Sequence, residues 1–290
     1  MRHTASATIV LTSVLAVAAT VGAQTRDDSA AVPARTKQRS TQKAEQPPAI
    51  DPRAIDALRK MSGFLRTQQN YAVDTTGKQD YVLPSGEKVQ LSSHGNLIVA
   101  NPNRLRASVV SDRKERQFFF DGKTFTMFSP RPNYYTSITL PTRTTNRELV
   151  EHLDANYAVE LPLADVLRWS TVGASINDIT RATYIGTEWI NNAETDHYSF
   201  RQRGLDWQVW IERGNQPLPR RLVLTTTDDP ARPEYAVDMT WHLGTRPSDA
   251  VFAFTPPNDA MKIAMASREQ LASREQANKA RRTSQPTKED

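Results

Sequence analysis

The order of apolar and polar positions predicts one helix followed by a long series of strands. Asp51 before Pro52 is typical of a helix start, because proline is tolerated at the first helical position. Apolar residues then recur at helical spacing and form one stripe, made of Ile55, Leu58, Met61, Phe64 and Leu65. We interpret this stripe as part of a core.

After this helix, segments rich in β-branched and aromatic residues alternate with turn residues, which is typical of strands. Strands are predicted at 71–83, 88–100, 104–111, 116–120, 123–128, 134–138, 183–190, 196–202, 205–212, 220–227, 235–243 and 252–254. Two helices are predicted between the two groups of strands, at 146–157 and 161–169. Helices are too few for alternating βαβ units, so the fold class is mainly β (α+β) with an antiparallel sheet.

The Asp121-Gly122 turn predicts a hairpin in which Phe118 pairs with Phe125. Directly paired residues point to the same side of a sheet, so one strongly apolar face is expected. Candidate residues for an apolar cavity come from this face, from a second strand and from the helix at 161–169: Phe118, Phe120, Phe125, Met127, Trp207, Val209, Ile211 and Leu167. Such a face can close round a helix as packed core or leave a cavity for an apolar ligand, and both alternatives stay open.

The two ends of the chain differ from its middle. Residues 1–23 are typical of a signal peptide, with Arg2, an uncharged apolar stretch, and small residues before Gln24. A membrane anchor is the alternative, although the apolar run is shorter than the ~20 residues of a spanning helix. We expect a disordered linker at 24–49, one folded domain at 50–263, and a polar, disordered tail at 264–290 in which a short helix is the alternative.

The pI of 9.4 does not indicate nucleic-acid binding once the charges are mapped. Residues 24–49 hold five Lys/Arg against three Asp/Glu, and residues 262–290 hold seven against four. The middle of the chain, 50–261, carries 24 basic and 25 acidic residues. A phosphate-binding surface needs a basic stripe on the folded part, and the linear sequence has none.

Candidate catalytic chemistry is sparse. The chain has no cysteine, which excludes disulfides, thiol catalysis and cysteine metal sites. Histidines 94, 152, 197 and 242 lack metal-ligand spacing, and no nucleophile elbow or phosphate loop is present. Carboxylates such as Asp228-Asp229, or Asp112 with Glu115, fall in predicted turns and connections, where surface charge is the expected role. We therefore predict no catalytic residue, metal or cofactor.

Several segments resemble the uncharacterised predicted periplasmic proteins of the LolA/LolB-like superfamily of lipoprotein carriers. The resemblance covers residues 51–263 and rests on the order of modest motifs. They are Asp51-Pro52, Pro102-Asn103-Arg104, Phe118–Phe125, Glu160–Asp165, Asp206–Glu212, Pro217–Arg220 and Phe252–Pro257. The resemblance implies an unclosed, curved antiparallel half-barrel of about a dozen strands around a few helices, in which the carriers hold acyl chains.

Three functions compete at this point. The first is an exported periplasmic carrier or sensor that binds an apolar ligand, a lipid or the acyl chain of a lipoprotein, without catalysis. The second is an envelope protein-interaction module with a packed core, whose basic tails could touch anionic lipid headgroups. The third, a hydrolase, has the least support. No integral membrane segment is expected after signal cleavage.

Overall fold

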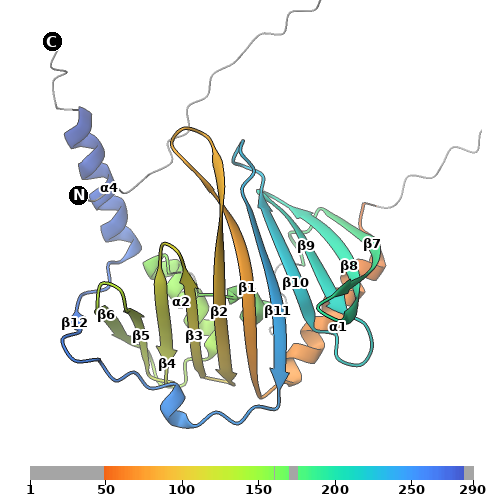
Figure 1. The fold of residues 1–290 in the computed structure, drawn as a ribbon, viewed down its shortest axis with the longest axis horizontal. Helices are drawn as coiled ribbons and strands as arrows, with labels where there is room; N and C mark the ends of the chain where they lie inside the picture. The colour runs from red at the N-terminus through yellow and green to blue at the C-terminus, as the bar shows by residue number, and fades with distance from the viewer. Residues whose placement is uncertain (1–48, 160, 170–175, 284–290) are drawn as a thin grey trace, which may run out of the picture. The chain divides into compact units, whose positions relative to one another are not determined.

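The computed structural model describes residues 49–159, 161–169 and 176–283. The predicted signal peptide at 1–23 and nearly all of the predicted linker at 24–49 lie outside these residues. The folded part is one curved sheet that is open at both edges, with helices on its inner side (Figure 1).

Twelve strands form this sheet in the described part of the chain. They are β1 (Asn70–Val82), β2 (Lys88–Ala100), β3 (Arg104–Ser111), β4 (Glu115–Phe120), β5 (Thr124–Ser129), β6 (Tyr134–Thr139), β7 (Arg181–Ile190), β8 (Ala193–Gln202), β9 (Leu205–Glu212), β10 (Pro219–Thr226), β11 (Glu234–Leu243) and β12 (Met261–Lys262). Their order is β12-β6-β5-β4-β3-β2-β1-β11-β10-β9-β8-β7. Neighbours pair antiparallel, except that β12 pairs with β6 in parallel. The predicted mainly antiparallel, unclosed sheet is confirmed.

Three helices cover the inner face of the sheet: α1 (Pro52–Thr67), α2 (Asn146–Tyr157) and the short α3 (Ala164–Trp169). Asp51 caps α1 by accepting a hydrogen bond from the backbone N–H of Arg53, as its sequence position indicated. A capping box starts α2, in which Thr145 and Glu148 satisfy each other's backbone N–H groups. Both helices therefore begin where local chemistry predicts, and each turns its apolar stripe toward the sheet.

The Phe118–Phe125 hairpin is correct in its faces but wrong in its register. Phe120 pairs with Phe125, and Phe118 with Met127, so the loop is two residues longer than predicted. The Asp121 side chain accepts hydrogen bonds from the backbone N–H groups of Lys123 and Thr124 and closes this longer turn. A shift of two residues leaves every side chain on its predicted face, because the strand period is two.

The predicted strand at 252–254 is wrong. A 3₁₀ turn, η1 (Asp249–Val251), precedes these residues, and the chain then crosses the outer face to reach β12 (Figure 1). The ring of Phe254 lies 5.1–5.4 Å, centroid to centroid, from the rings of Phe119, Phe128 and Tyr135. Phe254 therefore packs on aromatic side chains of the outer face, and its alternation with Phe252 does not mark a strand. We call residues 244–260 the strap.

A further helix, α4 (Arg268–Thr283), lies in the stretch where a polar tail was expected and a short helix was the alternative. Arg268 at its start donates hydrogen bonds to the carbonyl oxygen and a carboxylate oxygen of Asp154 in α2. This contact joins the start of α4 to the end of α2.

Candidate functional site

The space between the inner face of the sheet and the helices is filled by one apolar cluster. Seven of the eight predicted cavity residues are buried members of it: Phe118, Phe120, Phe125, Leu167, Trp207, Val209 and Ile211. Met127 is half-buried and packs against the same cluster. The cluster spans the curve of the sheet, because β4 and β5 lie on one limb and β9 on the other, with five strands between them.

Aromatic rings connect α3 to the β9 limb. The ring of Trp169 in α3 stacks 6.2 Å from Trp207, and Trp207 stacks 4.2 Å from Phe200 of β8. Large rings are the principal apolar surface of a core or a ligand site, since each covers much area at little conformational cost. The predicted residues from β9 and α3 therefore form one continuous apolar wall.

This interior is closed in the structure. Phe120, Phe125 and Val209 have no exposed surface, and Trp207 is 4% exposed. Two surface hollows of the described residues lie away from this interior, one on the outer face and one between α2 and the start of α4. An apolar ligand would therefore have to displace side chains that now contact one another.

Two tyrosines, the buried Tyr71 and the half-buried Tyr235, bring hydroxyl groups to the inner side of β1 and β11. Burial raises the pKa of Tyr71 above its ordinary value. Burial, assisted by the negative charge of Asp165, raises the pKa of Tyr235 to about 12. Both phenols are neutral at physiological pH, so they add hydrogen-bonding groups to the interior without adding charge.

Exposed ion pairs link the ends of α2, α3 and α4. Arg168 lies 3.4 Å from Asp154 and 3.5 Å from Asp165, and Arg268 also reaches Asp154. All four side chains are more than a third exposed, and exposed ion pairs contribute about 0–1 kcal/mol. Apolar burial, rather than ion pairing, holds these two helices against the sheet.

The outer face carries a polar network that the sequence analysis did not identify. Asp74 on β1 accepts a hydrogen bond from Asn96 on β2 at 2.7 Å, and its other oxygen lies 2.8 Å from His242 Nε2 on β11. The bond from Asn96, with the contact to His242, holds the pKa of Asp74 below its ordinary value. These residues lie 22 and 168 positions apart in the chain, so only the strand register reveals them.

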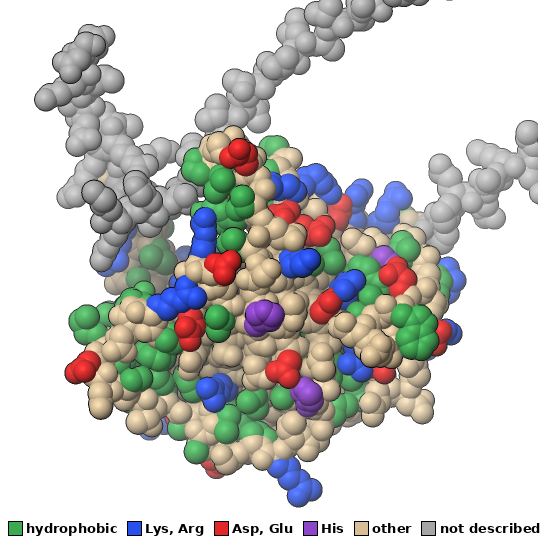
Figure 2. Space-filling model, viewed as in Figure 1, with side chains coloured by type: hydrophobic (Ala, Val, Ile, Leu, Met, Phe, Trp, Pro, Cys, Tyr) green, Lys and Arg blue, Asp and Glu red, His purple; other side chains and the backbone are tan. Residues whose placement is uncertain are grey.

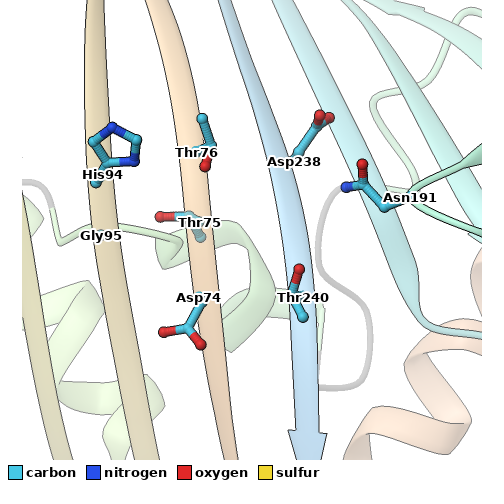
Figure 3. A pocket seen from close by; sticks show the side chains of 8 residues that line it. All are labelled: Asp74, Thr75, Thr76, His94, Gly95, Asn191, Asp238 and Thr240. Atoms are coloured by element: carbon cyan, nitrogen blue, oxygen red, sulfur yellow. The ribbon is translucent and has the colours of Figure 1, made fainter.

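Beside this network the outer face is hollowed over β1, β2 and β11, and Asn191 in the β7–β8 turn lines the same hollow (Figure 3). Figure 2 shows histidine side chains, in purple, over the middle of this face. No group of three metal-ligating side chains occurs among the described residues. His197 lies 3.0 Å from both Glu188 and Gln208 and stacks on Trp210, so it is a satisfied strand histidine.

Among the described residues, no helix combines the length and the hydropathy of a membrane span. No curated protein matches the sequence.

Solved structures give distant similarities. LprF from Mycobacterium bovis is 16% identical, with a TM-score of 0.42 over 73% of this chain and 100% of that chain. A LolA superfamily protein from Nitrosomonas europaea is 12% identical, with a TM-score of 0.34 over 69% and 97%. A chain of the MucA/MucB complex of Pseudomonas aeruginosa is 13% identical, with a TM-score of 0.39 over 70% and 61%.

A family model matches residues 54–266, which include every described strand and the helices α2 and α3. Its description is "Predicted periplasmic protein (DUF2092)". The match spans well over half of the chain and coincides with the sheet and its helices. The family predicted from the sequence is thus confirmed, and the chain belongs to this family of predicted periplasmic proteins.

Proposed function

We propose that this protein is exported to the periplasm through its N-terminal signal peptide and binds an apolar ligand between sheet and helices, without catalysis. The ligand class is an acyl chain, carried by a lipid or a lipoprotein, and the role is that of a carrier or sensor. The observation that carries the proposal is the uninterrupted apolar wall from β4 and β5 to β9, covered by short helices rather than by a second sheet.

Opening this interior requires α2 and α3 to move away from the sheet. Their buried apolar side chains, among them Leu149, Leu153 and Leu167, each gain about 1.5–3 kcal/mol from burial. An acyl chain offers about 0.8 kcal/mol per methylene, so roughly 15 methylenes return about 12 kcal/mol. The free energy needed to displace part of the helix pair is thus within the range that burial of one acyl chain offsets.

Binding of this kind has low headgroup specificity, because apolar burial is non-directional. Neither ionised nor metal-binding groups are needed in the interior, and the tyrosine hydroxyls there are neutral. Directional transfer would arise from differences in affinity between donor, protein and acceptor.

The experiment is native mass spectrometry of the mature chain from Gln24, purified from a periplasmic fraction and then extracted with organic solvent. A bound mass that is released as lipid is expected. A ligand-free protein that also fails to bind a fluorescent fatty acid would overturn the proposal.

Two matched variants test the location of the ligand. Val209→Thr introduces a hydroxyl into the interior, and Val223→Thr makes the same change at a buried position on the outer face. An unpaired buried hydroxyl costs about 1–3 kcal/mol, so Val209→Thr should weaken fatty-acid binding by about tenfold. Val223→Thr should leave the affinity unchanged, and equal losses in both variants would contradict an interior site.

The closed interior favours a second candidate, an envelope protein-interaction module in which this cluster is only core. In that case neither native mass spectrometry nor fatty-acid titration would detect a ligand. Cross-linking in the periplasm, followed by mass spectrometry, would instead identify a protein partner.

A further inference from the structure

The hollow on the outer face has a volume of about 510 Å³ and lies on the opposite side of the sheet from the apolar interior. Its lining comes from three adjacent strands and one distant turn: Asp74, Thr75, Thr76, His94, Gly95, Asp238, Thr240 and Asn191 (Figure 3). None of these side chains takes part in the function proposed above, so this hollow is a separate feature of the molecule.

The charged groups of the hollow are already paired. Asp74 is held by Asn96 and His242, and Asp238 accepts two hydrogen bonds from Arg221, one of them at 2.8 Å. Each carboxylate is therefore already hydrogen-bonded, and Asp238 also has the positive charge of Arg221 beside it. A ligand that bound by net charge, such as a phosphate or a metal ion, would have to break these pairs.

Other polar side chains of the hollow have no hydrogen-bond partner within the part of the chain that the structure describes. Thr76, Thr240, His94 and Asn191 make no side-chain hydrogen bond to any described residue. Hydroxyl, imidazole and amide groups supply both donors and acceptors within one hollow. This combination suits a neutral ligand that itself has many donors and acceptors.

The β7–β8 turn lies against the outer face of the sheet, where Asn191 lines the hollow. Asn191 and Asn192 both have positive φ angles, 47° and 63°, as a two-residue hairpin turn requires. Ile190 anchors the end of the hairpin by packing against Trp210 and Val223 on the outer face. Trp189, which is 71% exposed, directly precedes Ile190 in β7 and therefore projects from the opposite face of this hairpin.

We propose that this hollow binds a neutral saccharide chain. The unpartnered hydroxyl, imidazole and amide groups would exchange hydrogen bonds with sugar hydroxyls. The proposal is independent of acyl binding, because the two sites lie on opposite faces of the sheet.

The test is isothermal titration of the full-length mature protein with hexasaccharides of glucose and of N-acetylglucosamine, with a heparin hexasaccharide as the anionic comparison. One of the neutral sugars is expected to bind, and heparin is not. Binding of heparin alone, or of none of the three sugars, would overturn the proposal.

Two pairs of variants locate the site. Asn191→Gly removes the amide that lines the hollow, whereas Asn192→Gly changes the other residue of the same turn; glycine accepts both φ angles. Thr76→Val with Thr240→Val removes two hydroxyls, and Thr225→Val makes the same change outside the hollow. We expect Asn191→Gly and the Thr76/Thr240 pair each to weaken binding by about tenfold or more. The two controls should bind as the wild type does, and the Val209→Thr variant should too. Unchanged affinity in both hollow variants would refute this location.

Discussion

Replacing Phe254 by alanine tests how the strap stabilises the outer face of β4–β6. Phe254 is half-buried, and its ring contacts those of Phe119, Phe128 and Tyr135. A fully buried Phe→Ala change costs about 3–5 kcal/mol, and each aromatic pair contributes about 0.5–1.5 kcal/mol beyond area. For a half-buried ring with three partners, we expect a loss of roughly 2–3 kcal/mol in the free energy of unfolding.

The assay is equilibrium urea unfolding followed by tryptophan fluorescence. With a slope of roughly 2–3 kcal/mol per molar urea, the midpoint should fall by about 1 M without a change in slope. Phe254→Leu should recover part of the loss because it keeps apolar cover but no ring. Ile263→Ala, at a position 41% exposed, should lie within about 0.5 kcal/mol of the wild type. A Phe254→Ala variant that is equally close to the wild type would refute the reasoning.

Four further changes have signs fixed by the structure. Gly63→Ala in α1, where the nearest atom to an added Cβ is 3.8 Å away, should stabilise by about 0.5–1 kcal/mol. Gly95→Ala, whose Cβ would lie 2.7 Å from Thr75 Oγ1, should destabilise by about 1–3 kcal/mol; urea unfolding measures both. Thr145→Ala should cost about 1 kcal/mol and raise amide exchange in the first turn of α2, and unaltered exchange would argue against the cap. The raised pKa of Tyr235 means that its burial stabilises the fold fully below pH 10 and that this stability is lost between pH 10 and about pH 12. Tyr235→Phe should flatten the pH dependence of unfolding in that window, and an unchanged slope there would contradict it.

Local patterns were sufficient to predict most of the elements. The helix at 146–157 and the strands at 88–100, 104–111 and 205–212 have their predicted bounds. Period-two alternation also placed Phe118, Phe120 and Phe125 on the inner face despite the wrong register, because a shift of two residues conserves faces. The exact turn depended on the Asp121 side chain, which a pattern of apolar positions does not encode.

What depended on distant contacts could not be predicted in the same way. The strap looked like a strand because Phe252 and Phe254 alternate with alanine, yet these rings pack on strands more than 100 residues earlier in the chain. The Asp74–His242 contact and the hollow beside it depend on β1 pairing with β11, whose partners are separated by about 170 residues. The sequence analysis named His242 only among histidines without metal-ligand spacing, and it did not identify Asp74. Alternation likewise identified the interior side chains, but not whether they contact one another or surround a cavity.

The most direct test of the proposed acyl-binding interior is an isotope-filtered NMR measurement on the mature protein with methyl-labelled valine, leucine and isoleucine and an unlabelled fatty acid. The account predicts intermolecular contacts from the acyl methylenes to the methyl groups of Val209, Ile211 and Leu167, and none to Val223 on the outer face. Contacts confined to Val223, or the absence of any contact at saturating fatty acid, would contradict an interior that receives an acyl chain.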